Sequence, residues 1–594
     1  MMAKLRAGKK LEYGVFFLYI ALYCLITVYH EPWFDEAQSW QIAKCASLRE
    51  LFLEIPHYEG HPPLWWLILA IPAKLGVPFE IGLKSVGFLI AVPSVYLILF
   101  RLPYPRLMRL LLPLSYFVFY QYGIIVRPYG LMMLAFLLLA LAFPGRDRHP
   151  WRFAGLLALL CLTSAYGIVM AGGIALCRVW ELLREKGLKG FILGAFRDRR
   201  SLALGVLLIA AILLVMEIMP RSDTLVTSKN AVNSFPLCLL CALLTFVGEC
   251  TITTSSWFSI DRTLLQHVYL PTGELVLMCV IGCLLWVLII GASSKRHLKY
   301  LLVPYILLSL FSAMVYFSVH HVGVVLLLLL FWLGALFQDE NRFEIGRAVI
   351  RRIAKNDRDT RLLKKTALAA CAVCLLVPVF WSVSSSISEI QKEYSYGRHA
   401  AAFLKEHDLE NSRIFSIWGT NASLAGLEED DGLPHNSDYV GIPVLITAYY
   451  DRNICLNLNC GKDDEAYMHY RIASEEEDAE SIASWRENGV PNILLGKADL
   501  ELVFDGIDLD QYTLVEALPV NYIWKTSVSS GILPLCARND IMDQYQLEPL
   551  EDEGINLWFN GFRVTDEMRE AYENGVPMEE ILKPYLDALF GVGG

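Results

Sequence analysis

The sequence has little charge for its length and contains none of the common nucleotide or zinc motifs. Only 19% of its 594 residues are Asp, Glu, Lys or Arg, whereas 55% are hydrophobic, and the mean hydropathy is +0.43. There is no dinucleotide-type glycine motif, P-loop, nucleophile elbow or zinc-ligand spacing. These values exclude a disordered chain, a disulfide scaffold and an ordinary soluble protein, and they indicate a membrane protein.

Charge divides the chain into two parts. Residues 1–387 carry 37 Lys and Arg against 22 Asp and Glu, whereas residues 388–594 carry 14 against 39. We therefore predict a membrane domain over 1–387 and an acidic extracytoplasmic domain over 388–594.

The membrane domain contains enough apolar segments for about eleven transmembrane helices. Residues 151–180 have basic residues on both sides and should form two short helices hinged near Ser164–Tyr166. The remaining expected spans cover 13–29, 83–101, 108–122, 128–143, 201–219, 273–292, 299–318, 322–337 and 366–387.

Basic loops orient these helices in a plasma membrane. The apolar stretches 61–76 and 235–248 are short for a crossing, and we expect them to be juxtamembrane helices on the outer face. The basic loops 101–109, 295–299 and 342–365 then all face the cytoplasm, as does the N-terminus. The long outer segments are loop one (30–82), a second loop (220–272) and the C-terminal domain, so the chemistry is expected there.

Loop one carries adjacent carboxylates among aromatic residues. Asp35 and Glu36 follow the first helix, and apolar positions from Asp35 to Phe52 recur at helical spacing. This pattern predicts one amphipathic helix on the membrane surface. The carboxylates could bind a metal, activate a hydroxyl or orient a sugar; the alternative is solvation within an interfacial aromatic belt.

Three sequence pieces of this region resemble the GT-C superfamily of polytopic glycosyltransferases. They are WFDEAQSWQIA from Trp33, GHPPLWWLIL from Gly60 and VRPYGLMML from Val126. Their order and spacing are most similar to the protein O-mannosyltransferase and aminoarabinose-transferase branch (glycosyltransferase family 39-like), over residues 1–180. Beyond residue 180 the resemblance is architectural only: further helices, then an outer domain.

The resemblance implies a membrane all-α GT-C fold with a soluble α/β C-terminal domain. It also implies transfer of a sugar from a polyprenyl-phosphate carrier to an acceptor on the outer face, with inversion. Asp35 occupies the position of the family's loop-one acidic residue and would deprotonate or orient the acceptor. Glu36 is either the true base or a hydrogen-bond partner of Asp35.

Other residues are candidates for binding the substrate. Glu59 and His61 precede the Pro-Pro turn, and His61 would contact sugar or phosphate or simply cap the turn. Arg127 lies between two apolar runs, where an ionisable residue is costly, and would bind the carrier phosphate through its guanidinium. Its alternative is snorkelling toward the interface. Four further candidates line the expected outer ends of helices: Tyr129, Tyr166, His320 and His321.

The residues leave the cofactor open and allow more than one class of partner. Asp35 and Glu36 could hold a divalent cation through oxygen, and the acceptor is a lipid, a glycan or a protein. The basic 342–365 stretch favours contact with anionic membrane lipids over nucleic acid. The rival functions are a lipid or sugar transporter and an inactive envelope-assembly scaffold; the absence of an internal repeat counts against the transporter.

The C-terminal domain alternates helix-like and strand-like segments. We expect helices over 397–407 and 474–488 and strands over 413–418, 444–449, 492–495 and 512–517. Cys455 and Cys460 either pair as a disulfide or stay reduced.

Overall fold

The structure is a computed structural model. It describes residues 9–194, 196–224, 235–254, 272–291, 295–315, 317, 319–339, 356–416, 441–450, 452–455, 467, 488–496, 508–550, 565–574, 576 and 580–581.

The chain forms two compact units. The first contains Met1–His30, Ser47–Lys392 and Ile523–Val528, and the second contains Glu31–Ala46, Glu393–Tyr522 and Ser529–Gly594. The predicted division at residue 388 is close to the change at Lys392, but a short piece of loop one belongs to the second unit.

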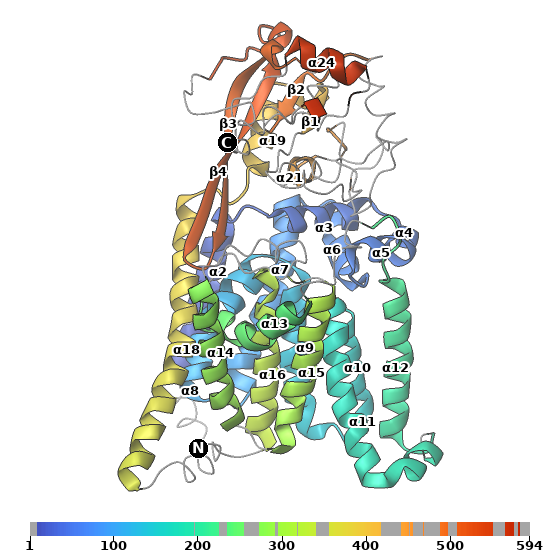
Figure 1. Cartoon of the computed structure of the whole chain (residues 1–594), viewed down its shortest axis with the longest axis vertical. Helices are drawn as coiled ribbons and strands as arrows, with labels where there is room; N and C mark the ends of the chain where they lie inside the picture. The colour runs from blue at the N-terminus through green and yellow to red at the C-terminus, as the bar shows by residue number, and fades with distance from the viewer. Residues whose placement is uncertain are drawn as a thin grey trace. The chain divides into compact units, whose positions relative to one another are not determined.

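The first unit is built of helices, many of them long and running side by side (Figure 1). Among the described residues, eight helical stretches are long and apolar enough to cross a membrane: Lys10–Tyr29, Phe79–Arg101, Pro128–Gly145, Ala165–Leu193, Arg199–Glu217, Gly273–Gly291, His297–Met314 and Asp357–Gln391. Its helices are α2 (Lys10–Tyr29), α4 (Leu48–Leu53), α5 (Ile55–Glu59), α6 (Leu64–Lys74), α7 (Phe79–Tyr96), α8 (Arg106–Leu111), α9 (Pro128–Ala142), α10 (Pro150–Cys161), α11 (Ala165–Leu193), α12 (Arg199–Glu217), α13 (Phe235–Glu249), α14 (Thr272–Gly291), α15 (Lys295–Met314), α16 (Gly323–Asp339) and α18 (Asp357–Gln391).

Glycines let neighbouring helices approach closely. A Cβ on Gly173 of α11 would lie 2.6 Å from the Pro304 Cα of α15, and one on Gly282 of α14 would overlap the Leu244 carbonyl of α13. Small residues at such crossings are typical of helices packed within a membrane, where van der Waals contact drives association.

The eight stretches agree with eight of the expected spans, and the count of eleven stays a prediction. Among the shorter apolar helices, α10 has 12 residues and α16 has 17. The hinge expected near Ser164 is confirmed: Ser164 ends the turn between α10 and α11, and its hydroxyl accepts a hydrogen bond from the Gly167 amide at 3.3 Å. The two helices are not both short, however, because α11 has 29 residues and continues to Leu193.

The expected single helix over 108–122 is wrong. The chain instead forms α8, a 3-10 turn at Leu112–Leu114 and a π-helical segment at Phe117–Ile124. Pro113 has no amide to donate, and the Ser115 hydroxyl donates to the Leu112 carbonyl at 2.7 Å. Both effects interrupt an α-helix.

The single amphipathic helix expected over Asp35–Phe52 is also wrong. Two helices replace it: α3 (Phe34–Cys45), which belongs to the second unit, and α4, which belongs to the first. Ser47 starts α4 by accepting from the Glu50 amide at 3.2 Å, while the Glu50 carboxylate accepts from the Ser47 amide at 2.6 Å. This capping box makes residue 47 a helix start rather than a helix interior.

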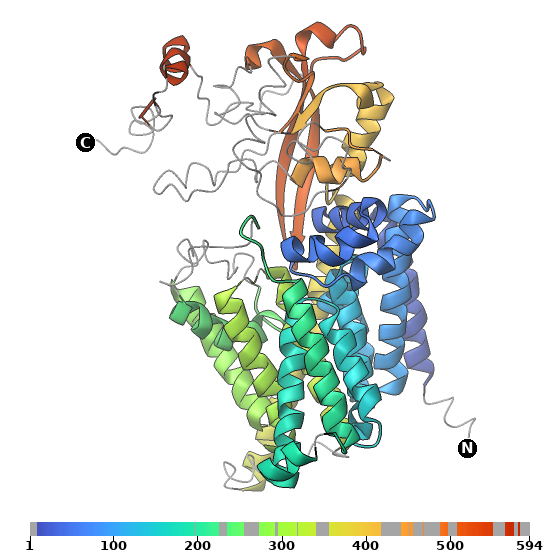
Figure 2. The ribbon, with the colours of Figure 1, turned by 90° about the vertical axis from the view of Figure 1, so that its right-hand side faces the viewer.

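The second unit is a small α/β arrangement with a four-stranded sheet. The strand order is β1-β2-β4-β3, with β1 and β2 parallel and β2 and β4 antiparallel. Strands β3 and β4 form the long hairpin visible in Figure 2. The other helices of this unit are α19 (Gly397–Glu406), α21 (Gly441–Thr447) and α24 (Asp566–Glu573), and the strands are β1 (Ile414–Ser416), β2 (Ile493–Leu495), β3 (Tyr512–Trp524) and β4 (Ser527–Arg538).

Helix α19 and strands β1, β2 and β3 lie where the sequence predicted them, although β3 continues to Trp524, and strand β4 was not predicted. The strand expected over 444–449 is helix α21, because a short apolar run does not distinguish a buried strand from a buried helix. Pro443 near its start is typical of a first helical turn. The helix expected over 474–488 lies outside the described residues except for Asn488, and so does Cys460, the expected disulfide partner of Cys455.

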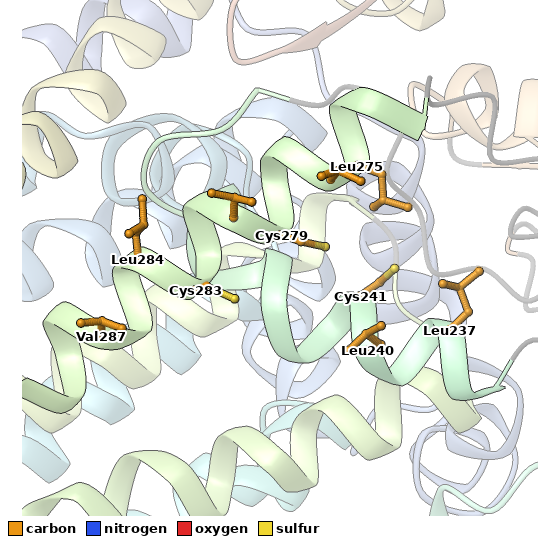
Figure 3. Close-up of a pocket in the computed structure, with 10 residues that line it drawn as sticks. Leu237, Leu240, Cys241, Leu275, Cys279, Cys283, Leu284 and Val287 are labelled. Atoms are coloured by element: carbon orange, nitrogen blue, oxygen red, sulfur yellow. The ribbon is translucent and has the colours of Figure 1, made fainter.

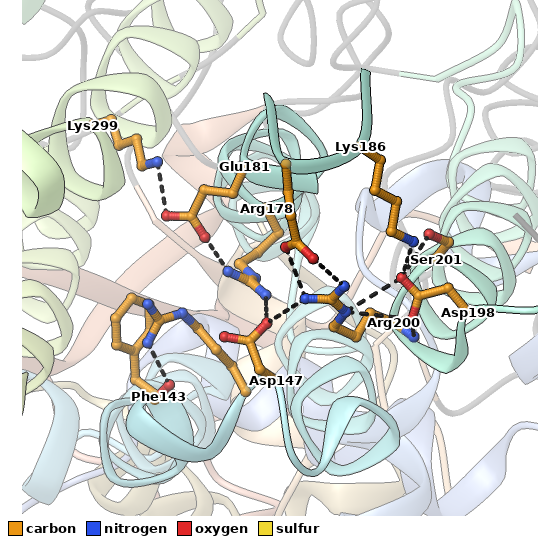
Figure 4. Close-up of polar contacts among 11 residues, drawn as sticks. Phe143, Asp147, Arg178, Glu181, Lys186, Asp198, Arg200, Ser201 and Lys299 are labelled. Atoms are coloured by element: carbon orange, nitrogen blue, oxygen red, sulfur yellow. Dashed lines mark hydrogen bonds and ion pairs between the residues drawn. The ribbon is translucent and has the colours of Figure 1, made fainter. Parts of the chain in front are cut away.

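A network of ion pairs joins α11, α12 and α15 of the first unit (Figure 4). The buried Arg178 of α11 contacts Asp147 at 2.5 Å and also Glu181, which in turn contacts Lys299 of α15 at 2.7 Å. Arg200 of α12 joins the network through Asp147 at 3.4 Å and also pairs with Glu185 of α11 at 2.7 Å. Arg178 and Glu181 lie more than three turns along α11 from Ser164 and Tyr166, so the network is separate from the start of that helix.

Candidate functional site

Six of the nine predicted site residues come together in the first unit. Arg127 is the extended residue immediately before α9, and Pro128 occupies the first helical position, where its missing amide costs nothing. The Arg127 guanidinium carbon lies 5.2 Å from the centre of the Tyr129 ring. The local sequence Arg-Pro-Tyr thus places a cation and an aromatic ring together at a helix start.

Two histidines lie against this start. His320 and His321 form a short turn between α15 and α16, with their ring centres 3.9 Å apart. The His321 ring lies 5.4 Å from the Tyr129 ring. Sequence positions almost 200 residues apart are therefore in direct contact.

Tyr166 completes the same contact group from the first turn of α11. Its ring centre lies 4.8 Å from that of His321, and its hydroxyl lies 3.3 Å from the His321 Nδ1. The sequence analysis missed Tyr122, whose hydroxyl donates to the His320 carbonyl at 3.0 Å and whose ring lies 5.4 Å from Tyr129. Tyr122 was not recognised because it lies in the segment 108–122, which was expected to be one transmembrane helix. We call Arg127, Tyr129, Tyr166, His320, His321 and His61 the Arg–His cluster.

Burial sets the charge of this cluster. Desolvation, together with the Arg127 charge, lowers the pKa of His61 to about 3 and holds the pKa values of His320 and His321 well below the usual range. The His61 Nδ1 is buried and has no hydrogen-bond partner among the described residues. At neutral pH, Arg127 is a fixed positive charge beside neutral imidazoles. The cluster is thus suited to an anion that also accepts hydrogen bonds.

The remaining three candidates lie elsewhere along loop one. Glu59 is the half-buried last residue of α5 in the first unit, followed by Gly60 in the left-handed conformation at φ 63° and then by His61. Asp35 and Glu36 lie in the first turn of α3, in the second unit. Glu36 is fully buried, and its carboxylate accepts a hydrogen bond from the Trp33 amide at 2.8 Å. Asp35 is half-buried.

The described part of the chain holds no group of three or more His, Cys, Asp or Glu side chains placed to bind a metal ion. The expectation that Asp35 could hold a divalent cation therefore has no supporting ligand set among these residues, and it stays a prediction.

Sequence reasoning also missed a buried polar group at the end of the first helix. His30 Nδ1 lies 2.7 Å from the Glu389 carboxylate of α18, and the Tyr120 hydroxyl donates to the same carboxylate. All three residues are almost fully buried. The signal in the sequence was Glu389 itself, because a carboxylate near the end of an apolar helix is costly to bury unless another group pairs with it.

An apolar groove of about 460 Å³ runs between α13 and α14 (Figure 3). Its walls are leucine, valine and the three cysteines Cys241, Cys279 and Cys283, which present almost no polar surface. Such a lining suits hydrocarbon and not a sugar or phosphate, so we do not count the groove as part of the Arg–His cluster.

The likeness to a solved structure is weak. No protein-family profile and no curated protein matches the chain. Among solved structures, the chain is similar to the cryo-EM structure of the arabinofuranosyltransferase AftD from Mycobacteria, with 14% sequence identity and a TM-score of 0.36. The match covers 88% of this chain and 40% of that one, so the chain spans less than half of AftD. A likeness at this level carries no functional assignment.

Proposed function

We propose that the protein is an integral membrane glycosyltransferase of GT-C type. It moves a sugar from a polyprenyl-phosphate carrier to a lipid, glycan or protein acceptor on the extracytoplasmic face, with inversion. Residues 1–387 form the catalytic body in the plasma membrane, with the N-terminus in the cytoplasm. Residues 388–594 form an extracytoplasmic domain that shapes acceptor access.

The observation that carries this proposal is the chemistry of the Arg–His cluster. A carrier phosphate bears negative charge and accepts hydrogen bonds, and charge builds up on it as the sugar leaves. Arg127 offers a planar fork of donors that matches phosphate oxygens. Neutral imidazoles and tyrosine hydroxyls add donors without adding charge that would hold the product too tightly. Stabilising the leaving phosphate is the main electrostatic need of the reaction.

Asp35 is the proposed base that deprotonates or orients the acceptor. Its neighbour Glu36 is buried and caps the start of α3, which is a structural use of that carboxylate. The half-buried Asp35 is the better candidate for contact with a substrate. Its role rests on the resemblance of loop one to the family motif.

Binding of the carrier by an Arg127 variant tests the phosphate assignment. Arg127→Met should weaken binding of a fluorescent polyprenyl monophosphate in nanodiscs by about 10- to 100-fold, the equivalent of about 1.5–3 kcal/mol for a charged hydrogen bond.

Arg146→Met is the matched control, because Arg146 is also buried and also lies over an aromatic ring, 4.1 Å from Phe143. Its carrier affinity should stay within about twofold of wild type, or about 0.4 kcal/mol, because Arg146 follows the C-terminal end of α9 whereas Arg127 precedes its start, and its guanidinium donates to the Phe143 carbonyl. Equal losses in both variants would show that any buried arginine matters and would remove the phosphate site from Arg127.

A further inference from the structure

Lys525 is a buried lysine in the turn between β3 and β4, within the segment Ile523–Val528 that belongs to the first unit. Its Nζ donates to the Glu249 carboxylate at 2.8 Å, to the Glu249 carbonyl at 2.8 Å and to the Thr253 carbonyl at 2.7 Å. These three acceptors match the three donors of an ammonium group. The backbone at Lys525 has φ 53°, a left-handed conformation that is uncommon for a residue with a side chain.

This lysine caps the end of α13. Glu249 is the last residue of that helix, where carbonyl groups lack intrahelical donors and the helix dipole favours a cation. The ammonium also lies 4.3 Å from the centre of the Trp381 ring of α18. Lys525 therefore joins the turn to two helices of the first unit through contacts that are costly to break singly.

A first line of contacts runs from this cap to the Arg–His cluster. Phe246, one turn before Glu249 on α13, stacks on Phe317 with ring centres 4.4 Å apart. Phe317 in turn lies 5.6 Å from the His321 ring. Two aromatic contacts thus connect α13 to His321, so a displacement of α13 would displace the His321 ring.

A second line starts at Trp524, the neighbour of Lys525. The Trp524 ring lies 6.2 Å from Phe117, which lies 5.9 Å from Tyr122, the donor to the His320 carbonyl. The packing leaves little freedom, because a Cβ on Gly323 would lie 2.3 Å from Phe117 and 2.6 Å from the Tyr122 hydroxyl. A shift of Phe117 would therefore be passed to the turn that carries the histidines.

We propose that Lys525 and Trp524 are positioning residues for the Arg–His cluster. The β3–β4 turn holds α13 and the Phe117–Ile124 segment in place, and these set His320 and His321 against Tyr129 and Arg127. The proposal depends on the proposed function only in taking the cluster as the site of the carrier phosphate.

Histidine modification tests the positioning without any activity measurement. Diethyl pyrocarbonate modifies accessible neutral imidazoles, and mass spectrometry reports each site. In Lys525→Met the buried Glu249 carboxylate loses its ammonium partner and keeps the Thr253 hydroxyl, which donates to it at 2.9 Å. The turn should shift, and modification of His320 and His321 should become about tenfold faster, which corresponds to about 1.4 kcal/mol of lost positioning energy. Glu249→Gln should do the same. The double variant should lie closer to wild type than either single variant, because it removes both buried charges.

Two controls separate local from global effects. His297 is 2% exposed and lies 6.2 Å from Phe143, so it should stay protected in every variant. Lys186→Met removes another ion pair of the first unit, the one with Asp198, and should leave His320 and His321 protected. If Lys525→Met left both histidines protected, or if it exposed His297 equally, the positioning role would be wrong.

Carrier binding by the same variants distinguishes the two proposals. Positioning predicts that Lys525→Met weakens polyprenyl monophosphate binding along with the loss of protection. Loss of protection in a protein whose wild type binds no polyprenyl phosphate would uphold the positioning and refute the phosphate site.

Discussion

Among single residues, the three histidines of the Arg–His cluster show how burial sets chemistry. Each imidazole is kept neutral by desolvation and by the nearby guanidinium of Arg127, and the neighbouring His320 and His61 lower the pKa of His321 further. Neutral histidines can donate to a phosphate through one ring nitrogen without repelling Arg127.

The same burial predicts a pH dependence of stability. The folded-state pKa values of His61, His320 and His321 lie below the unfolded value of about 6.5. As the pH falls below about 6.5, the unfolded chain therefore binds more protons than the folded chain. The free energy of unfolding decreases over this range, and for His61 the decrease continues until the pH reaches its folded-state pKa of about 3. The melting temperature of the purified protein, followed by tryptophan fluorescence, should fall between pH 7.5 and pH 5.

Replacing both His320 and His321 by Gln should flatten this fall. The control is His149→Gln, a change at an exposed histidine outside the Arg–His cluster, which should leave the slope unchanged. A slope identical in wild type and in the His320/His321 variant would mean that these two imidazoles do not resist protonation in the folded protein.

The individual contacts also show what sequence reasoning can reach. The binding role of Arg127 could be predicted because a cation between two apolar runs is energetically costly. Tyr129 could be predicted because it belongs to the same Arg-Pro-Tyr motif. Tyr122 and Lys525 could not be predicted, because a tyrosine in an apolar run and a lysine in an acidic domain are both ordinary. Their importance comes from tertiary contacts, which a sequence pattern does not contain.

Among helices and strands, α2 and α18 are joined by a buried polar contact. His30 ends α2, and the Glu389 carboxylate of α18 accepts from Tyr120 and contacts His30. Glu389→Ala should lower the free energy of unfolding by about 3–5 kcal/mol, since it removes one partner from a buried polar group. Chemical denaturation in detergent measures this change.

Glu393→Ala provides the comparison for Glu389. The Glu393 side chain is 50% exposed and pairs with His399 at 3.3 Å, an arrangement that contributes about 0–1 kcal/mol. Similar losses for the two variants would indicate that Glu389 is solvated and not buried between the helices.

The errors in predicted elements have local causes. Hydropathy alone identified 108–122 as a span, but Pro113 and Ser115 break it into three pieces. The run at 444–449 was too short for periodicity to distinguish strand from helix. By contrast, the hinge at Ser164 was predictable because the basic residues on both sides of 151–180 required the chain to turn back.

For the whole molecule, charge asymmetry and hydropathy predicted most of the organisation. In the part of the chain that the structure describes, eight helices long and apolar enough for a membrane lie where apolar runs were expected, and a mixed sheet lies in the acidic part. The assignment of Glu31–Ala46 to the second unit was not predictable, because it depends on contacts such as Gln41 with the Val444 carbonyl at 2.5 Å. This assignment matters since Asp35 lies in that piece.

The most direct test of the proposed transferase is release of the carrier. Purified protein in nanodiscs is given a mixed pool of polyprenyl-phosphate sugars and native envelope extract as acceptor, and free polyprenyl phosphate is measured over time. We expect release by wild type and by Asp357→Asn, a change at an exposed position of α18, and release about 10²–10⁴-fold slower by folded Asp35→Asn. Equal release by wild type and Asp35→Asn would contradict the role of Asp35, and absence of release by wild type would contradict the transferase itself.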